Sequence, residues 1–315
     1  MTNASQSIPS SFIWKRLHSL TGLWLVAFLI LHLFTNSQAA LPINEDASGF
    51  IKTANDIRQL PYLIFIEIAL LAIPFAIHII WGIKALQTSE PNSFQSDGSK
   101  PALPEYSRNH AYTWQRITSW LLLILIGLHV VHMRFLEMPI GGHKGLEKYF
   151  VVRIGNDLGL ATLSERLGVR LYTAAEIEQQ KAAANVEQVD ITNESDKLLQ
   201  EQRQKEQDEW VEALHARPLG KNQLLAVADN FATAELLMVR ETFKIPSMLV
   251  LYTVLVLASC YHAFNGLWTF MITWGVTLSP MAQRQMRWLS TLLMVIIAFL
   301  GLAAVWGTYW INLKQ

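Results

Sequence analysis

The sequence has one cysteine, Cys260, and few charged residues. A lone cysteine excludes an intrachain disulfide and a metal cluster held by several thiolates. Only 16% of the 315 residues are charged, and 25 lysines and arginines balance 25 aspartates and glutamates. This balance carries no cationic excess of the kind that binds phosphate backbones, so we expect no nucleic-acid partner.

Long apolar runs dominate the rest of the chain. The sequence is 51% hydrophobic and contains 11 tryptophans. Helices of about 20 apolar residues span the roughly 30 Å of hydrocarbon in a bilayer. Five runs approach or exceed that length, at residues 17–34, 61–83, 117–135, 246–268 and 288–310. We therefore predict an all-α membrane protein, a bundle of five transmembrane helices, surrounded by lipid.

The short connections between the runs indicate the orientation. Cytoplasmic loops of membrane proteins carry an excess of lysine and arginine. The cations of the short connections fall on one side: Lys15, Arg16, Lys84, Lys100, Arg108, Arg116, Arg284 and Arg287. The connection between the first two runs has no such excess. We expect a cytoplasmic N-terminus and an extracytoplasmic C-terminus.

The connection between the third and fourth runs is far longer than usual. We divide the chain into helices 1–3 at 1–136, a soluble extracytoplasmic insertion at 137–244, and helices 4–5 at 245–315. Residues 174–212 have the composition of a solvated helix, and the alternation at 151–171 predicts a short strand or a pair of helices. We expect this insertion to bind or cover rather than catalyse.

Four of the apolar runs each contain a histidine. A rise of 1.5 Å per residue places His32 about 24 Å and His129 about 20 Å from the inner surface. His78 and His262 lie about 25 Å from the outer surface by the same measure. A single such histidine could simply hydrogen-bond to a neighbouring helix. Four at two matched depths indicate two bis-histidine b haems, one near each surface. His132, one turn past His129, is the competing ligand.

Other residues near these depths are candidates for the cofactor periphery. Gly22 and Gly266 would let a porphyrin or a helix approach the backbone. Arg16 and Arg116 could pair with haem propionates, or could be positive anchors at the inner surface. His18 at the cytoplasmic edge is a candidate for the haem periphery or a quinone site. Glu67 is an acid within a span, and so a functional candidate or a protonated hydrogen-bonding group.

Several stretches resemble one family. RLHSLTG at 16–22, followed by His32, is similar to the first helix of succinate dehydrogenase cytochrome b558 subunits. LPYLIFIEIALLAIPFAIHIIWG resembles their second helix, and QRITSW at 115–120 their third. YHAFNGLWTFMITWGVTLSPMAQR at 261–284 resembles the fourth helix and the loop after it. The resemblance covers all five runs and adds Ser19 and Gln115 to the candidates.

This resemblance implies a chain that holds two b haems in a bacterial inner membrane. His32 and His129 would ligate the distal haem, and His78 and His262 the proximal one. Flavin and iron–sulfur clusters would be carried by a flavoprotein subunit and an iron–sulfur subunit on the cytoplasmic side. The electron acceptor would be a quinone, commonly menaquinone, and the complex could oligomerise. The insertion departs from the family. Related quinol:fumarate reductases carry a glutamate where this chain has Cys260, which favours the succinate-oxidising branch.

We therefore predict the membrane anchor of a succinate dehydrogenase, which itself performs no bond chemistry on succinate. Each ligand imidazole should donate its other N–H to a backbone carbonyl. The alternatives are the anchor of a quinol:fumarate reductase or another two-haem cytochrome b, a proton-coupled transporter using histidines and Glu67, and a scaffold without haem.

Overall fold

The computed structural model describes residues 8–41, 45–88, 93, 103–184 and 194–313. Five of its helices are long and apolar enough to cross a membrane, as predicted: Ser10–Ser37, Leu63–Thr88, Ser107–Leu136, Pro246–Thr273 and Pro280–Thr308. Several begin before the predicted apolar runs, because a helix continues into water beyond the segment that hydropathy detects. Lys100, used above for orientation, lies outside the described residues.

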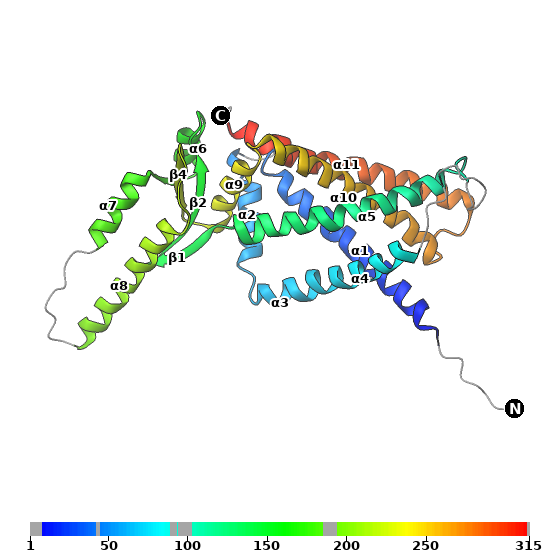
Figure 1. The fold of residues 1–315 in the computed structure, drawn as a ribbon, viewed down its shortest axis with the longest axis horizontal. Helices are drawn as coiled ribbons and strands as arrows, with labels where there is room; N and C mark the ends of the chain where they lie inside the picture. Colours follow the sequence, from blue (N-terminus) through cyan, green and yellow to red (C-terminus); the bar gives the residue numbers. More distant parts are fainter. Residues whose placement is uncertain (1–7, 42–44, 89–92, 94–102, 185–193, 314–315) are drawn as a thin grey trace. The chain divides into compact units, whose positions relative to one another are not determined.

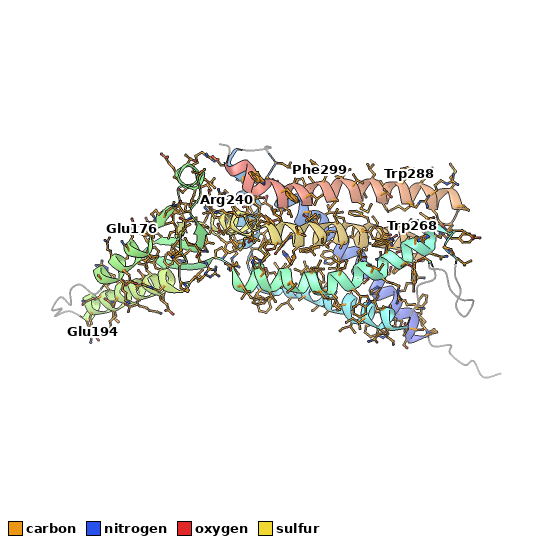
Figure 2. The ribbon with its side chains drawn as sticks, turned by 45° about the horizontal axis from the view of Figure 1, so that its top comes forward. Glu176, Glu194, Arg240, Trp268, Trp288 and Phe299 are labelled. Atoms are coloured by element: carbon orange, nitrogen blue, oxygen red, sulfur yellow. The ribbon has the colours of Figure 1, made fainter. Side chains whose placement is uncertain are left out.

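The spanning helices carry the labels of Figure 1. They are α1 (Ser10–Ser37), the run α3 (Leu63–Glu67), η2 (Ile68–Ala72) and α4 (Ile73–Thr88), then α5 (Ser107–Val130) with η3 (Val131–Leu136), α10 (Pro246–Thr273) and α11 (Pro280–Leu313). Large apolar side chains remain exposed on them, such as Trp288 and Phe299 on α11, at 69% and 60% (Figure 2). Such exposure suits helices solvated by lipid rather than water.

The second span contains a π-helical turn, η2, that follows from Pro74. Proline has no N–H to donate to the carbonyl four residues earlier, which here belongs to Leu70. The indole Nε1 of Trp24 in α1 donates to that carbonyl oxygen instead, at 2.5 Å. The contact replaces the missing helical hydrogen bond and joins α1 to the second span.

The chain forms two compact units. The first comprises Met1–Phe34, Pro61–Leu128 and Leu251–Leu302, the greater part of the spanning helices. The second comprises Thr35–Leu60, His129–Val250 and Ala303–Gln315.

The second unit contains a four-stranded antiparallel sheet with strand order β1-β2-β4-β3. Its strands are β1 (Ile140–Lys144), β2 (Glu147–Gly155), β3 (Arg170–Tyr172) and β4 (Gln223–Ala228). Its helices are α2 (Ser48–Arg58), α6 (Leu160–Arg166), α7 (Ala174–Ala184), α8 (Glu194–His215) and α9 (Phe231–Thr242), with the 3-10 turn η1 (Glu45–Ala47) before α2. Residues 151–171 thus form most of one strand, a helix and the start of another strand, and 174–212 fall in two helices rather than one.

Helices cover both faces of this sheet. On one face Trp210 of α8 packs against Tyr149 and Val227, with Ile177 of α7 in the same core. On the other face lies α9, most of which is buried (Figure 1). The side chain of Asn230 caps α9 by accepting from the N–H of Thr233. The last four residues of β4 are all buried, as expected for a strand covered on both faces, so the insertion has a hydrophobic core of its own.

Ion clusters tie the sheet to both of its membrane junctions. At the entry, the Glu137 carboxylate lies 3.4 Å from Arg153 and 3.6 Å from Arg217. At the exit, Arg240 and Lys244 bind Asp157, with N–O distances of 2.8 and 2.5 Å. The first cluster joins the end of β2 to the segment that follows η3, and the second joins the loop after β2 to the end of α9, which leads into α10.

The connection between the first two spans packs on the insertion. Asp46 pairs with Arg166 at 2.8 Å, and Asn55 of α2 hydrogen-bonds to Asn230 at 2.9 Å. Phe50 and Leu236 share a small buried core. The predicted insertion boundaries at 137–244 remain a prediction, since the compact unit that contains this sequence also includes residues from two other connections.

Candidate functional site

Two of the predicted haem ligands face each other in the first unit. His78 comes from α4 and His262 from α10, and their ring centroids are 6.2 Å apart with the planes at 81°. Both side chains are half-buried. Their matched depths predicted that these two histidines lie close together, and their rings are indeed neighbours.

The protonation of His78 follows from its neighbour His18. Nδ1 of His78 lies 3.2 Å from the backbone carbonyl oxygen of His18. A carbonyl only accepts hydrogen bonds, so Nδ1 carries the proton and Nε2 has a free lone pair. The His18 ring also stacks on the His78 ring, with centroids 4.1 Å apart and planes at 14°. This is the carbonyl partner that we expect for a ligating imidazole.

His262 is held by two hydroxyl groups instead of a carbonyl. Its Nδ1 lies 3.4 Å from the hydroxyls of both Thr118 and Ser119 on α5. Each hydroxyl already donates its one proton to the backbone of α5, Thr118 to Trp114 and Ser119 to Gln115. The hydroxyl oxygens are therefore left to accept, so Nδ1 of His262 is also the protonated nitrogen.

The pair fits the axial ligation of one haem iron. Two imidazoles bound on opposite sides of an ion, each by a metal–nitrogen bond of about 2 Å, have centroids about 6 Å apart. Both Nε2 atoms have lone pairs available, as iron ligation requires. Within the described residues, no group of three or more His, Cys, Asp and Glu side chains could hold a metal ion. Two imidazoles could therefore hold a metal ion only if a macrocycle, such as a porphyrin, supplied its other ligands.

Polar contacts between α5 and α10 fix the backbone at His262. Gln115 donates to the carbonyl of His262 at 3.1 Å and accepts from Asn265 at 2.7 Å. A Cβ on Gly266 would lie 3.8 Å from the Gln115 amide nitrogen. Gln115 and Gly266, both predicted near the cofactor, therefore lie beside the turn of α10 that carries His262.

Arg16 and Ser19 lie where α1 meets the end of α10. Arg16 donates to the carbonyl of Thr273 and lies over the ring of Trp274, 4.9 Å from its centroid. Ser19 accepts from the indole nitrogen of Trp274 at 3.2 Å. Arg116 donates to the carbonyl of Leu86 near the end of α4. These residues bind helix ends, and a role toward haem propionates or a quinone stays a prediction.

The remaining predicted site residues are less closely connected. Glu67 is half-buried at the end of α3, beside the π-helical turn. His32 stacks on Phe28 within α1, with centroids 5.5 Å apart. His129 lies near the end of α5, and His132 falls in the π-helical η3. His32 and His129 belong to different compact units, so their pairing stays a prediction.

Three features of the site were missed by reasoning from sequence. The stacking of His18 on His78 and the hydroxyls of Thr118 and Ser119 could have been suspected, because all three residues stand in the quoted motifs. The contact of Trp24 with Leu70 could have been suspected from Pro74, because a proline within a helix leaves the carbonyl four residues earlier without its helical hydrogen bond.

One comparison with known proteins bears on this site. The chain is 24% identical over 297 residues to the succinate dehydrogenase cytochrome b558 subunit of Bacillus subtilis (strain 168), an alignment that covers 94% of this chain and 96% of that protein. No protein-family profile matches, and no solved structure matches. The resemblance to succinate dehydrogenase cytochrome b558 subunits that the motifs indicated is confirmed along almost the whole chain.

Proposed function

We propose that this chain is the membrane-anchor cytochrome b subunit of a succinate dehydrogenase. It would pass electrons from an iron–sulfur subunit through two bis-histidine haems to a quinone, menaquinone in our proposal. The observation that carries the proposal is the facing pair of His78 and His262, each with Nδ1 bound and Nε2 available. The similarity to a cytochrome b558 subunit supports the same conclusion.

The haems, when bound, would supply one-electron chemistry that none of the side chains provides. The chain's own residues hold and tune them. His78 and His262 would ligate the proximal haem, and His32 and His129 the distal one. The His18 carbonyl and the hydroxyls on α5 orient the proximal ligands and raise their basicity. Arg16, Arg116 and Glu67 remain candidates for propionate or quinone contacts.

The proposed orientation places the N-terminus in the cytoplasm and the insertion and C-terminus outside the membrane. The flavoprotein and iron–sulfur subunits would then bind the cytoplasmic side, near the proximal pair. The packing of α2 on α9 supports one part of this orientation. α2 belongs to the connection between the first two spans and α9 to the connection between the third and fourth, so both connections must lie on the same side of the membrane. Because the distal pair lies toward the outer surface, we place quinone reduction there.

Spectra of the purified chain test the proposal. Bis-histidine haem produces a sharp α-band on reduction, and we expect two haems per chain together with co-purifying flavoprotein and iron–sulfur subunits. Addition of succinate should then reduce haem in that preparation. A preparation without haem would instead favour a transporter or a scaffold, and haem with other soluble partners would favour another class of cytochrome b.

A further inference from the structure

An apolar recess of about 500 Å³ lies between α1 and the second span. It is lined by five residues of α1 and one of the second span: Leu20, Thr21, Leu23, Trp24, Ala27 and Pro74. The hydroxyl of Thr21 is satisfied within its own helix, where it donates to the carbonyl of Leu17. None of the six side chains is charged, and none is a histidine, cysteine or methionine that could ligate a haem iron. The recess is therefore suited to a hydrocarbon chain.

The recess is held open beside a fixed contact and faces lipid. The Trp24 indole donates to the carbonyl of Leu70 at 2.5 Å, one turn before Pro74, and this bond joins the two helices next to the recess. The side chains of Leu20 and Trp24 are 49% and 45% exposed. Apolar side chains that remain exposed on a spanning helix are solvated by lipid. The recess therefore opens toward the hydrocarbon of the bilayer.

A pair of tryptophans lies further along the same junction. Trp14 of α1 stacks on Trp81 of α4, with ring centroids 6.1 Å apart and planes at 11°. The ammonium group of Lys84 lies over the Trp81 ring, 4.9 Å from its centroid. Trp81 follows Pro74 by seven residues, and Trp14 precedes Thr21 by seven, so each tryptophan shares a helix face with a residue of the recess. Seven residues correspond to about 10 Å along the helix axis.

The charge at this end of the junction is positive. Neither α1 nor α4 contains an aspartate or a glutamate. The Lys84 side chain is exposed, and no carboxylate pairs with it among the described residues. Arg16, by contrast, is bound to the carbonyl of Thr273 and to the ring of Trp274. Tryptophans mark the depth of lipid head groups, and basic pockets between spanning helices bind anionic head groups. Lys84 thus complements a negative charge at that depth.

We propose that the junction of α1 and the second span binds one phospholipid with an anionic head group. The phosphate lies at Lys84 beside the tryptophan pair, and one acyl chain enters the recess between Trp24 and Pro74. Lys84 follows Pro74 by ten residues, about 15 Å along the helix. An acyl chain reaches that far, because two leaflets of such chains make up about 30 Å of hydrocarbon. The proposed orientation places this lipid in the inner leaflet, whereas the site itself does not depend on the succinate dehydrogenase proposal.

Lipid titration of the purified protein tests this site. The haem-loaded protein, with the subunits that accompany it, is stripped of lipid in detergent and titrated with phosphatidylglycerol, and bound lipid is counted by native mass spectrometry. Lys84→Gln should weaken binding about 5-fold, whereas Lys15→Gln, which removes another exposed cation before the first span, should not. Ala27→Phe, which fills the recess, should also weaken binding, and Ala76→Phe, at an exposed position outside the recess, should not. Phosphatidylcholine with the same acyl chains should bind about 5-fold more weakly than phosphatidylglycerol.

The outcomes separate this lipid from other occupants. Equal weakening by Lys84→Gln and Lys15→Gln would mean a general attraction of anions to a positive surface, and would overturn the site. Equal binding of the two lipids, unchanged binding in Ala27→Phe, or no saturable binding to the wild type would overturn it as well. Displacement of phosphatidylglycerol by an equal concentration of a long-chain naphthoquinone would assign the recess to a quinone tail instead.

Two further measurements on the same preparations complete the test. Equal haem content and melting temperature of the lipid-free variants exclude a change in fold as the cause of weaker binding. Succinate-driven haem reduction tests the proposed function separately. If succinate fails to reduce haem while lipid binding depends on Lys84, the succinate dehydrogenase partnership is wrong and the lipid site stands.

Discussion

Gly22 lies directly against the imidazole of His78. A methyl group on its α-carbon would lie 3.0 Å from Cε1 and 3.4 Å from Nδ1 of that ring. The ring would have to move, and its 3.2 Å contact with the His18 carbonyl would change. The glycine therefore permits both the approach of α1 to α4 and the observed orientation of the His78 ring.

Gly22→Ala should lower proximal haem occupancy, because overpacking of this kind costs about 1–3 kcal/mol. The measurement is the haem content and the reduced spectrum of the purified protein. Gly127→Ala is the matched control, since a Cβ there meets nothing within 4 Å. Equal losses in the two variants would refute the argument from close approach.

Replacement of the histidines should remove the haems one at a time. His78→Ala or His262→Ala should eliminate the proximal haem and leave much of the distal one, because each variant would remove one proposed ligand of one pair. His32→Ala or His129→Ala should do the reverse. Redox titration of the visible spectrum distinguishes the two. If His132→Ala loses a haem and His129→Ala keeps both, the distal ligand lies one turn further along.

Removal of the two hydroxyls at His262 should raise the midpoint potential of the proximal haem. Without Thr118 and Ser119 as acceptors, Nδ1–H no longer increases the basicity of Nε2, so the ferric form loses stabilisation. Loss of such outer contacts commonly weakens metal binding by about 10–100-fold. The double variant Thr118→Val, Ser119→Ala is compared with wild type by potentiometry and haem retention. An unchanged potential would mean that these hydroxyls do not tune the ligand.

Asp157→Asn should destabilise the insertion by about 3–5 kcal/mol, since the buried guanidinium of Arg240 would lose the negative charge of its Asp157 ion pair. Burial raises the pKa of Asp157, but hydrogen bonds from Arg240 and Lys244 outweigh it and lower the pKa from the usual 3.8 to about 2. The carboxylate therefore stabilises the fold above pH 3.8, and the contribution is lost as the pH falls toward 2. Thermal unfolding at several pH values measures both effects. Asp229→Asn, a more exposed residue with a 3.8 Å ion pair, should change little.

Protease treatment of sealed vesicles should show on which side the insertion lies. Lys205 on α8 is 77% exposed in its side chain, so trypsin should cut there readily. In the proposed orientation, cleavage occurs only when the protease is on the outer side. Cleavage only from the cytoplasmic side would reverse the topology and, with it, the proposed site of quinone reduction.

The sequence alone predicted the five spans and the approach of His78 to His262. Apolar length reports a membrane helix directly, because the bilayer thickness sets it. Depth along a helix is a simple multiple of residue number, so His78 and His262 could be matched without coordinates. The same reasoning could not show which helix face each ring occupies. It therefore left His18, Thr118 and Ser119 without assigned contacts.

Tertiary structure decided what depends on contacts between distant segments. The sheet of the insertion pairs β2 with β4, separated by more than 60 residues, and no local pattern specifies that register. The cover of α9 by β2 and α2 also joins segments far apart in the sequence, which composition does not reveal. The protonated nitrogens of His78 and His262 likewise depend on acceptors supplied by other helices. The sequence specifies the functional group of each side chain, whereas the groups that the fold places around it determine its pKa, its tautomer and its partners.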